Sequence, residues 1–146
     1  MVAGGLFDPE EPPKTHAEQM ADFAIEALSL LDDVNMKLNS MLSVRIGINT
    51  GGPLIAGVLG TDKPTFDIIG DPINIASRLQ STDIAGKIQI SQATFELLQG
   101  SDYSIEKRGE IMLKGKGKTM TYLLSPQKIG FTTEAFSNGD LSAMLM

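Results

Sequence analysis

The stretch Phe66–Thr82 reads FDIIGDPINIASRLQST and decides the fold, because it joins a strand to a helix. Its opening residues are mostly apolar and predict a short strand that ends at Ile69. Asp71 and Pro72 then favour a helix start, since aspartate is a good N-cap and proline suits the first helical position. We expect this helix to run to about Gln80.

The helix in this stretch brings two polar side chains onto one face. Asn74 and Arg78 stand at positions i and i+4, so both can reach a single ligand. Ile75 and Leu79 lie on the neighbouring face and can anchor the helix in a core. The simpler alternative is an exposed polar pair on an amphipathic helix, and the spacing alone leaves both interpretations open.

The rest of the chain predicts a mixture of strands and helices around this stretch. Alternating apolar residues indicate strands at 44–49, 54–59, 87–90, 103–113 and 119–124, and helices are expected from Thr15 to about Asn39 and from Ser91 to Gly100. Thr15 and Glu18 form a capping-box pattern at the start of the long helix. Its predicted buried face consists of Met20, Phe23, Ala24, Ala27, Leu31, Val34 and Leu38. Strands and helices without strict alternation indicate the α+β class.

The composition limits the classes of protein to which this chain can belong. With 146 residues, it has the length of one domain. It contains no cysteine, which excludes disulfides and thiolate metal sites, and its net charge of −6 argues against nonspecific nucleic-acid binding. Only 5% of the residues are aromatic, which argues against an RNA-binding sheet that stacks bases. No apolar run approaches the roughly 20 residues of a membrane span, so we expect no membrane contact from this segment.

Basic side chains gather near the end of this acidic chain. Residues 106–118 carry the bases Lys107, Arg108, Lys114, Lys116 and Lys118 against the acids Glu106 and Glu110. Such a patch can bind a polyanion such as a chain of phosphates. It can equally be a solvated strand edge, which lysines protect from pairing with another chain.

Several segments occur in an order and at spacings that resemble one enzyme family. They are VRIGINTG, AGVLG, FDIIGDPINIASRLQST, KIQIS and RGEIMLKGKGKTMTYLL. Together they resemble about the later two-thirds of a class III nucleotidyl cyclase catalytic domain, over residues 1–125, and leave 126–146 as a C-terminal tail or linker. The resemblance implies a partial ferredoxin-like fold of βαββαβ type, with an antiparallel or mixed sheet flanked by helices. It also implies a homodimer or heterodimer with another cyclase domain, with the active site between the subunits.

The resemblance implies a role for each of five residues. Asn74 would orient the ribose, and Arg78 would stabilise charge on the α-phosphate while ATP is converted into 3′,5′-cyclic AMP and pyrophosphate. Arginine suits this role because its planar guanidinium stays charged. Lys114 would contact the terminal phosphates, and Arg45 would contact phosphates from the opposite subunit. Asp67 would read the purine, since a carboxylate accepts a hydrogen bond from the adenine amine and repels the guanine carbonyl.

The resemblance also implies two Mg²⁺ or Mn²⁺ ions held by two aspartates, and the sequence shows no matching aspartate. In the family these ligands lie upstream of the part that this chain resembles. We therefore expect that Met1 is an internal start or that the chain is a degenerate member, and that the isolated chain is inactive. The alternatives left open are a non-catalytic pseudo-cyclase that pairs with a complete domain, a guanylyl cyclase, and a nucleotide-binding or nucleic-acid-binding module. We expect a cytoplasmic signalling domain whose parent protein can carry a membrane anchor.

Overall fold

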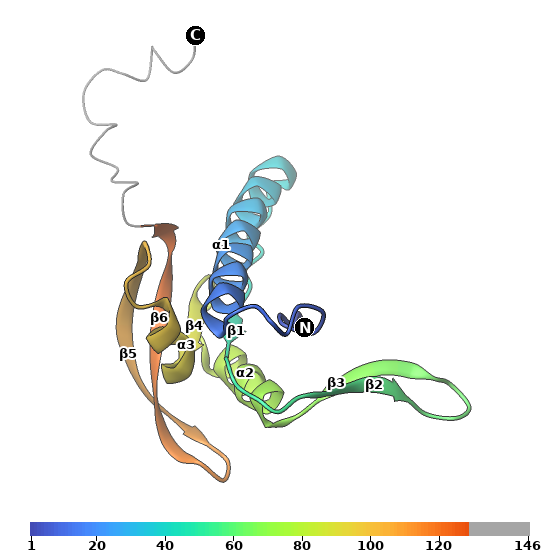
Figure 1. Ribbon diagram of the computed structural model, residues 1–146. Helices are drawn as coiled ribbons and strands as arrows, with labels where there is room; N and C mark the ends of the chain where they lie inside the picture. The colour runs from blue at the N-terminus through green and yellow to red at the C-terminus, as the bar shows by residue number, and fades with distance from the viewer. Residues whose placement is uncertain (129–146) are drawn as a thin grey trace, which may run out of the picture.

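The computed structural model describes residues 1–128, which form a four-stranded sheet with helices on both faces and a separate hairpin (Figure 1). In chain order the elements are α1 (Pro13–Leu38), β1 (Ile46–Ile48), β2 (Ile55–Leu59), β3 (Thr65–Ile69), α2 (Asp71–Thr82), β4 (Ile88–Ser91), α3 (Gln92–Leu98), β5 (Tyr103–Leu113) and β6 (Gly117–Lys128). The predicted α+β class is confirmed. Residues 126–128 belong to β6, and the rest of the expected tail, 129–146, lies outside the described residues.

The sheet has the strand order β1-β4-β6-β5 and is mixed, as predicted. β1 pairs with β4 in parallel, and β6 runs antiparallel to both β4 and β5. Every residue of β4 is buried. Ile88 and Ile90 pack in the core with α1 and α3, whereas Gln89 points to the other face, where its Nε2 donates to the Leu79 carbonyl of α2 at 2.8 Å. The helices therefore cover both faces of the sheet.

The face that the long helix α1 buries overlaps only in part with the one that the sequence predicts. Ala17, Ala21, Ala24 and Leu28 pack against the sheet and α3 at helical spacing. Alanine has a small side chain, so the helix axis can approach the sheet closely. The predicted face is confirmed in part, since Ala24 is 1% exposed and Met20 packs against the core. Its other bulky members are exposed, namely Phe23 at 54%, Val34 at 40% and Leu38 at 69%.

The two ends of α1 differ in how closely they follow the prediction. The expected capping box is wrong, since the helix starts at Pro13, two residues before Thr15, and no side chain caps it. Proline has a φ that already suits the first turn, which moves the start upstream. Asn39 ends the helix as expected, with a left-handed φ of 49°.

The helix α2 lies against β1 at a distance that only glycine allows. A Cβ atom at Gly47 would lie 2.4 Å from the Gln80 nitrogen and 2.5 Å from the Ala76 carbonyl oxygen. Both atoms belong to the helix backbone, so no rotation of a side chain can relieve the clash. Gly47 thus sets how closely α2 packs on the sheet.

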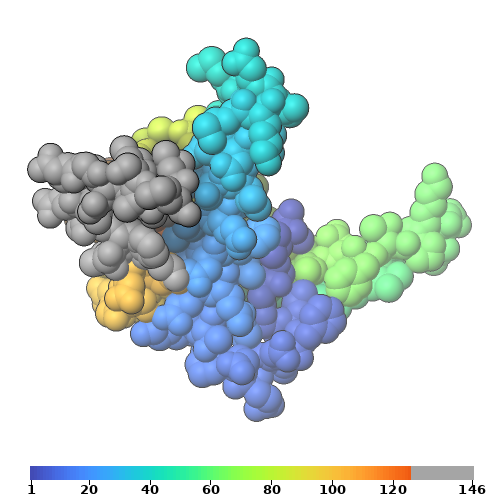
Figure 2. Space-filling model, turned by 90° about the horizontal axis from the view of Figure 1, so that it is seen from above, coloured from blue at the N-terminus to red at the C-terminus, as the bar shows by residue number. Residues whose placement is uncertain are grey.

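The strands β2 and β3 form a hairpin that projects from the rest of the protein (Figures 1 and 2). They pair antiparallel, with Val58 opposite Phe66. Large apolar side chains on this arm are exposed, namely Ile55 at 66%, Val58 at 66%, Leu59 at 48%, Phe66 at 59% and Ile69 at 46%. Opposed residues share a face and successive residues alternate, so Ile55 and Ile69 lie on one face of the ribbon and Val58 and Phe66 on the other. Exposed apolar side chains on both faces of a projecting arm indicate an interaction surface.

Asp83 links the end of α2 to the sheet. Its carboxylate accepts hydrogen bonds from the backbone nitrogens of Ile46 at 3.3 Å and Ile84 at 2.8 Å. Burial of the residue raises the pKa of this carboxyl, against the lowering effect of these two bonds and of Arg108 and Arg45.

We expect the D83N variant to change how stability depends on pH. A carboxyl whose pKa is raised by folding binds its proton more tightly in the folded state. Its contribution to the free energy of unfolding is therefore full below the ordinary pKa of 3.8 and is lost as the pH rises through the folded-state pKa. Urea unfolding of D83N and of the wild type, below pH 3.8 and above the folded-state pKa, measures the difference between their free energies of unfolding. A difference that stays constant with pH would contradict the assignment.

Candidate active site

A hollow between α2 and the turn from β5 to β6 brings together three of the five residues that the sequence singles out. Its volume is about 480 Å³. Asn74, Arg78 and Lys114 line it, and the other lining residues are Asp71, Ile75, Met112, Leu113 and Lys116. The basic side chains outnumber the acidic ones, so the hollow attracts an anionic ligand.

The apolar side of α2 anchors the helix beneath this hollow. Leu79 is 1% exposed and packs with Ile111 and Leu113 of β5, and Ile75 packs against the same cluster. The predicted anchoring role of Ile75 and Leu79 is confirmed. The helix and the strand that leads to Lys114 are therefore packed as one unit.

Arg78 is held next to β5 by a backbone acceptor. Its Nε donates to the carbonyl oxygen of Met112 at 3.3 Å. The guanidinium has further donors on its two terminal nitrogens, which can serve a ligand in the hollow. Asn74 lies one turn earlier on the same helix. Both side chains are exposed to solvent on the same face of α2.

The turn between β5 and β6 presents Lys114 on the other side of the hollow. The turn is closed by a bond from the Lys116 nitrogen to the Leu113 carbonyl at 3.0 Å. Gly115 and Gly117 have φ angles of 79° and 75°, which residues with side chains rarely adopt. The glycines of the KGKGK segment thus allow the tight turn that carries the lysines.

Asp71 and Lys116 also belong to the hollow, and the sequence assigned neither to it. The N-cap of α2 is Gly70, so the predicted Asp71 N-cap is wrong and Asp71 is the first residue of the helix. Its Oδ2 lies 2.6 Å from Lys116 Nζ. The two residues are far apart in the chain, and no local pattern could have paired them.

Asp67 and Arg45 do not line the hollow. Asp67 lies on β3 and is exposed, and its Oδ1 accepts a hydrogen bond from the Ile68 nitrogen at 2.8 Å. Arg45 is exposed immediately before β1. β3 leads directly through Gly70 into α2, so Asp67 stands on the approach to the start of the helix. Within residues 1–128 of one chain, Asp67 and Arg45 therefore do not lie in the same hollow as Asn74.

The described residues do not fit a pair of divalent metal ions. Within residues 1–128, no three Asp, Glu, His or Cys side chains lie close enough together to hold one ion. A magnesium ion is normally bound through carboxylates in near-octahedral geometry. Asp71 supplies the carboxylate of the hollow, and it already contacts Lys116. The lining of the hollow thus contains one carboxylate, whereas the resemblance implies two aspartates.

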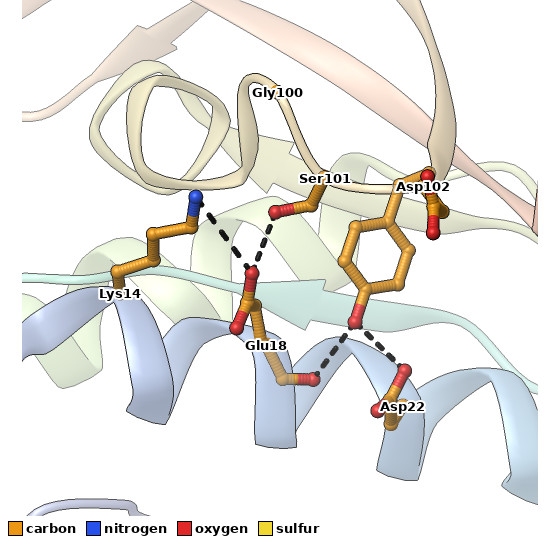
Figure 3. A pocket seen from close by; sticks show the side chains of 7 residues that line it. Lys14, Glu18, Asp22, Gly100, Ser101 and Asp102 are labelled. Atoms are coloured by element: carbon orange, nitrogen blue, oxygen red, sulfur yellow. Dashed lines mark hydrogen bonds and ion pairs between the residues drawn. The ribbon is translucent and has the colours of Figure 1, made fainter.

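A second hollow, of about 400 Å³, lies where α1 meets the loop before β5 (Figure 3). Ser101 Oγ donates to Glu18 Oε1 at 2.6 Å, and the Tyr103 hydroxyl donates to Asp22 Oδ1 at 2.7 Å. Burial, assisted by Asp22, raises the pKa of Tyr103, so its hydroxyl stays a donor. These bonds join α1 to Ser101 and to Tyr103 at the start of β5.

A comparison with protein families identifies the family of this fold. A family model described as the adenylate and guanylate cyclase catalytic domain matches residues 1–126. The chain belongs to this family. Enzymes of the family normally use divalent metal ions, and the cyclase domain described here carries the shared fold.

Curated relatives of the cyclase domain include proteins named for either purine. Adenylate cyclase type 9 of Gallus gallus is 42% identical over 131 residues, covering 84% of this chain and 10% of that protein. Guanylate cyclase soluble subunit beta-2 of Rattus norvegicus is 38% identical over 125 residues, covering 85% of this chain and 18% of that protein. The chain thus spans a small part of these relatives.

Solved cyclase structures resemble the domain over most of its length. The guanylate cyclase domain of RhGC from Catenaria anguillulae, in complex with GTP, has a TM-score of 0.71 at 35% identity and covers 83% of this chain and 65% of that one. The adenylyl cyclase CyaB from P. aeruginosa has a TM-score of 0.75 at 26% identity and covers 84% of this chain and 65% of that one.

Proposed function

We propose that this cyclase domain supplies one half of a composite active site that converts ATP into 3′,5′-cyclic AMP and pyrophosphate. The observation that carries the proposal is the single hollow shared by Asn74, Arg78 and Lys114. A second cyclase domain is proposed to supply the carboxylates that bind Mg²⁺ or Mn²⁺. The isolated chain is then inactive by itself.

Each residue of the hollow has a chemical task in this proposal. Arg78 donates to the α-phosphate, where negative charge grows as the ribose 3′-oxygen attacks and pyrophosphate leaves. Asn74, one turn earlier, holds the ribose by hydrogen bonds. Lys114 contacts the terminal phosphates as a point charge from the opposite side of the hollow. Arg45 is proposed to contact the phosphates in the site formed with the other subunit.

Asp67 is the reason to propose ATP rather than GTP. An ionised carboxylate accepts a hydrogen bond from the adenine amine, and it repels the carbonyl oxygen at the same place on guanine. Guanylate cyclase activity is the second candidate, because relatives at similar identity carry that name. A rhodopsin-guanylyl cyclase of converted specificity, 35% identical to this chain, is described in complex with ATPαS, so that domain accepted the other purine.

The proposal extends to the place of the domain in a larger protein. The catalytic unit, predicted to end at residue 125, would extend to the end of β6 at Lys128, within a cytoplasmic domain that acts in intracellular signalling. Among the helices of residues 1–128, none has the length and apolar character needed to cross a bilayer. Any membrane anchor of the parent protein is therefore proposed to lie outside these residues.

The projecting hairpin supports a dimer, and we expect the F66K variant to weaken dimerisation at least about tenfold. Phe66 stands directly opposite Val58, and both are more than half exposed. Burying a charge in an apolar interface is costly, whereas an exposed position on the free arm tolerates lysine. Analytical ultracentrifugation measures the association, and circular dichroism checks the fold. T61K, at the exposed tip of the same arm, is the matched control. Unchanged association of F66K would rule out the arm as the dimer contact.

Complementation tests the proposed function. The purified chain is mixed with a cyclase domain that keeps its metal-binding aspartates but has lost its own counterparts of Asn74 and Arg78. We expect cyclic AMP from manganese-ATP only in the mixture, with less product from manganese-GTP. Turnover by the chain alone would contradict the split site. A mixture that forms a complex without turnover would instead support the non-catalytic pseudo-cyclase.

A further inference from the structure

The side chains of Asp71 and Lys116 join the two walls of the hollow. Asp71 opens α2, and Lys116 lies in the turn between β5 and β6. Their charged atoms are 2.6 Å apart, with side-chain exposures of 62% and 46%. The carboxylate therefore stands among the cations of the hollow, where the proposed ligand would place its phosphates.

The contacts of α2 with β5 reach Met112, through Arg78, and Leu113, through Leu79, where the turn begins. A Cβ atom added at Gly115 or Gly117 would meet nothing within 4 Å, so both sides of the turn border open space. The backbone bond of Lys116, to Leu113, lies within the turn itself. Within the turn, the ion pair with Asp71 joins Lys116 to the start of the helix.

We propose that the Asp71–Lys116 pair is an internal latch that phosphates open. In the free protein the carboxylate of Asp71 pairs with the ammonium of Lys116 and keeps it from other anions. When a polyphosphate enters, Lys116 exchanges the carboxylate for a phosphate oxygen, and Asp71 is left to the solvent. This proposal rests on the proposed function, since it adds Lys116 and Asp71 to the same site.

The chemistry of the two residues suits such an exchange. Lysine is a point charge on a flexible stem, so it can change anionic partners with small movements. A pair as exposed as this one contributes little to stability, so opening it costs little. A polyphosphate carries more negative charge than one carboxylate, which favours the exchange. The latch also lowers the apparent affinity for polyphosphate, because the competing carboxylate must first be displaced.

A double-mutant cycle on the full chain tests the latch. The probe is sodium tripolyphosphate without metal, and isothermal titration calorimetry gives the dissociation constant. D71N is expected to tighten binding threefold to tenfold, and K116M is expected to weaken it by a similar factor. In the K116M background, D71N should tighten binding by less than half as much as it does in the wild-type background. Both effects are expressed as logarithms of affinity ratios. An equal gain in both backgrounds would show that Asp71 acts only as a repelling charge, and the latch would be refuted.

A second measurement separates the latch from the proposed function. Reductively methylated lysines give one NMR signal each, and D71N should shift the Lys116 signal in the ligand-free protein. Lys118, exposed on the neighbouring strand, is the control whose signal should stay in place. If tripolyphosphate fails to bind the wild type but this shift occurs, the phosphate site is wrong and the pair in the free protein is real. If D71N leaves the Lys116 signal unmoved, the latch is wrong whether or not the polyphosphate binds.

Discussion

Replacing Gly47 by alanine is expected to destabilise the protein by about 3 kcal/mol and to displace α2 from the sheet. The added methyl would lie 2.4 Å from the Gln80 nitrogen and 2.5 Å from the Ala76 carbonyl. The strand and the helix backbone must separate by roughly an ångström to restore an ordinary contact. Urea unfolding monitored by circular dichroism measures the loss of stability.

The same variant should also lose its affinity for tripolyphosphate, because α2 carries Asn74 and Arg78 into the hollow. Gly57→Ala is the matched control within a strand. A Cβ at Gly57 would meet nothing within 4 Å, so we expect its stability to stay within about 0.5 kcal/mol of the wild type. A G47A protein as stable as this control would show that the close approach of α2 to β1 is not needed.

Replacing Arg78 by alanine is expected to lower cyclic AMP formation by the complemented pair at least about 100-fold. The guanidinium is oriented by its bond to the carbonyl of Met112, two residues before Lys114. R78K should recover little of this loss, because the ammonium of lysine lacks the planar pair of terminal donors. In arginine that pair can bind two phosphate oxygens while Nε bonds to a carbonyl. Initial rates at saturating nucleotide measure the effect.

The loss in R78A should occur without loss of the fold. Arg78 is exposed, so its removal should change the free energy of unfolding by less than about 1 kcal/mol. Ser77→Ala is the control, since Ser77 is exposed on the same helix and does not line the hollow. If R78A retains the rate of S77A, the proposed role of the guanidinium is wrong.

The core of the candidate site follows from local pattern. Asn74 and Arg78 share a face because helix geometry brings positions i and i+4 together, and Leu79 is buried because it falls on the neighbouring face. The glycines around Lys114 indicate a turn without any knowledge of the tertiary structure. These features depend on short stretches of chain, and the structure shows each of them.

Features that depend on packing could not be predicted in the same way. α1 has bulky apolar residues on one face and alanines on another, and only contact with the sheet decides that Ala21 is buried and Phe23 exposed. The pairing of Asp71 with Lys116 depends on how a helix and a distant turn are placed. The need for glycine at position 47 depends on the distance between a strand and a helix.

The hairpin of β2 and β3 has a thermodynamic consequence for assembly. Within residues 1–128 its strands pair only with each other, and a two-stranded ribbon alone is marginally stable in water. Ordering the arm therefore costs conformational entropy, and the arm loses this entropy when a partner docks on it. β3 continues through Gly70 into α2 without an intervening loop, so an ordered arm also restrains the start of that helix. Assembly and the preorganisation of the nucleotide site are in this way thermodynamically coupled, and each should strengthen the other.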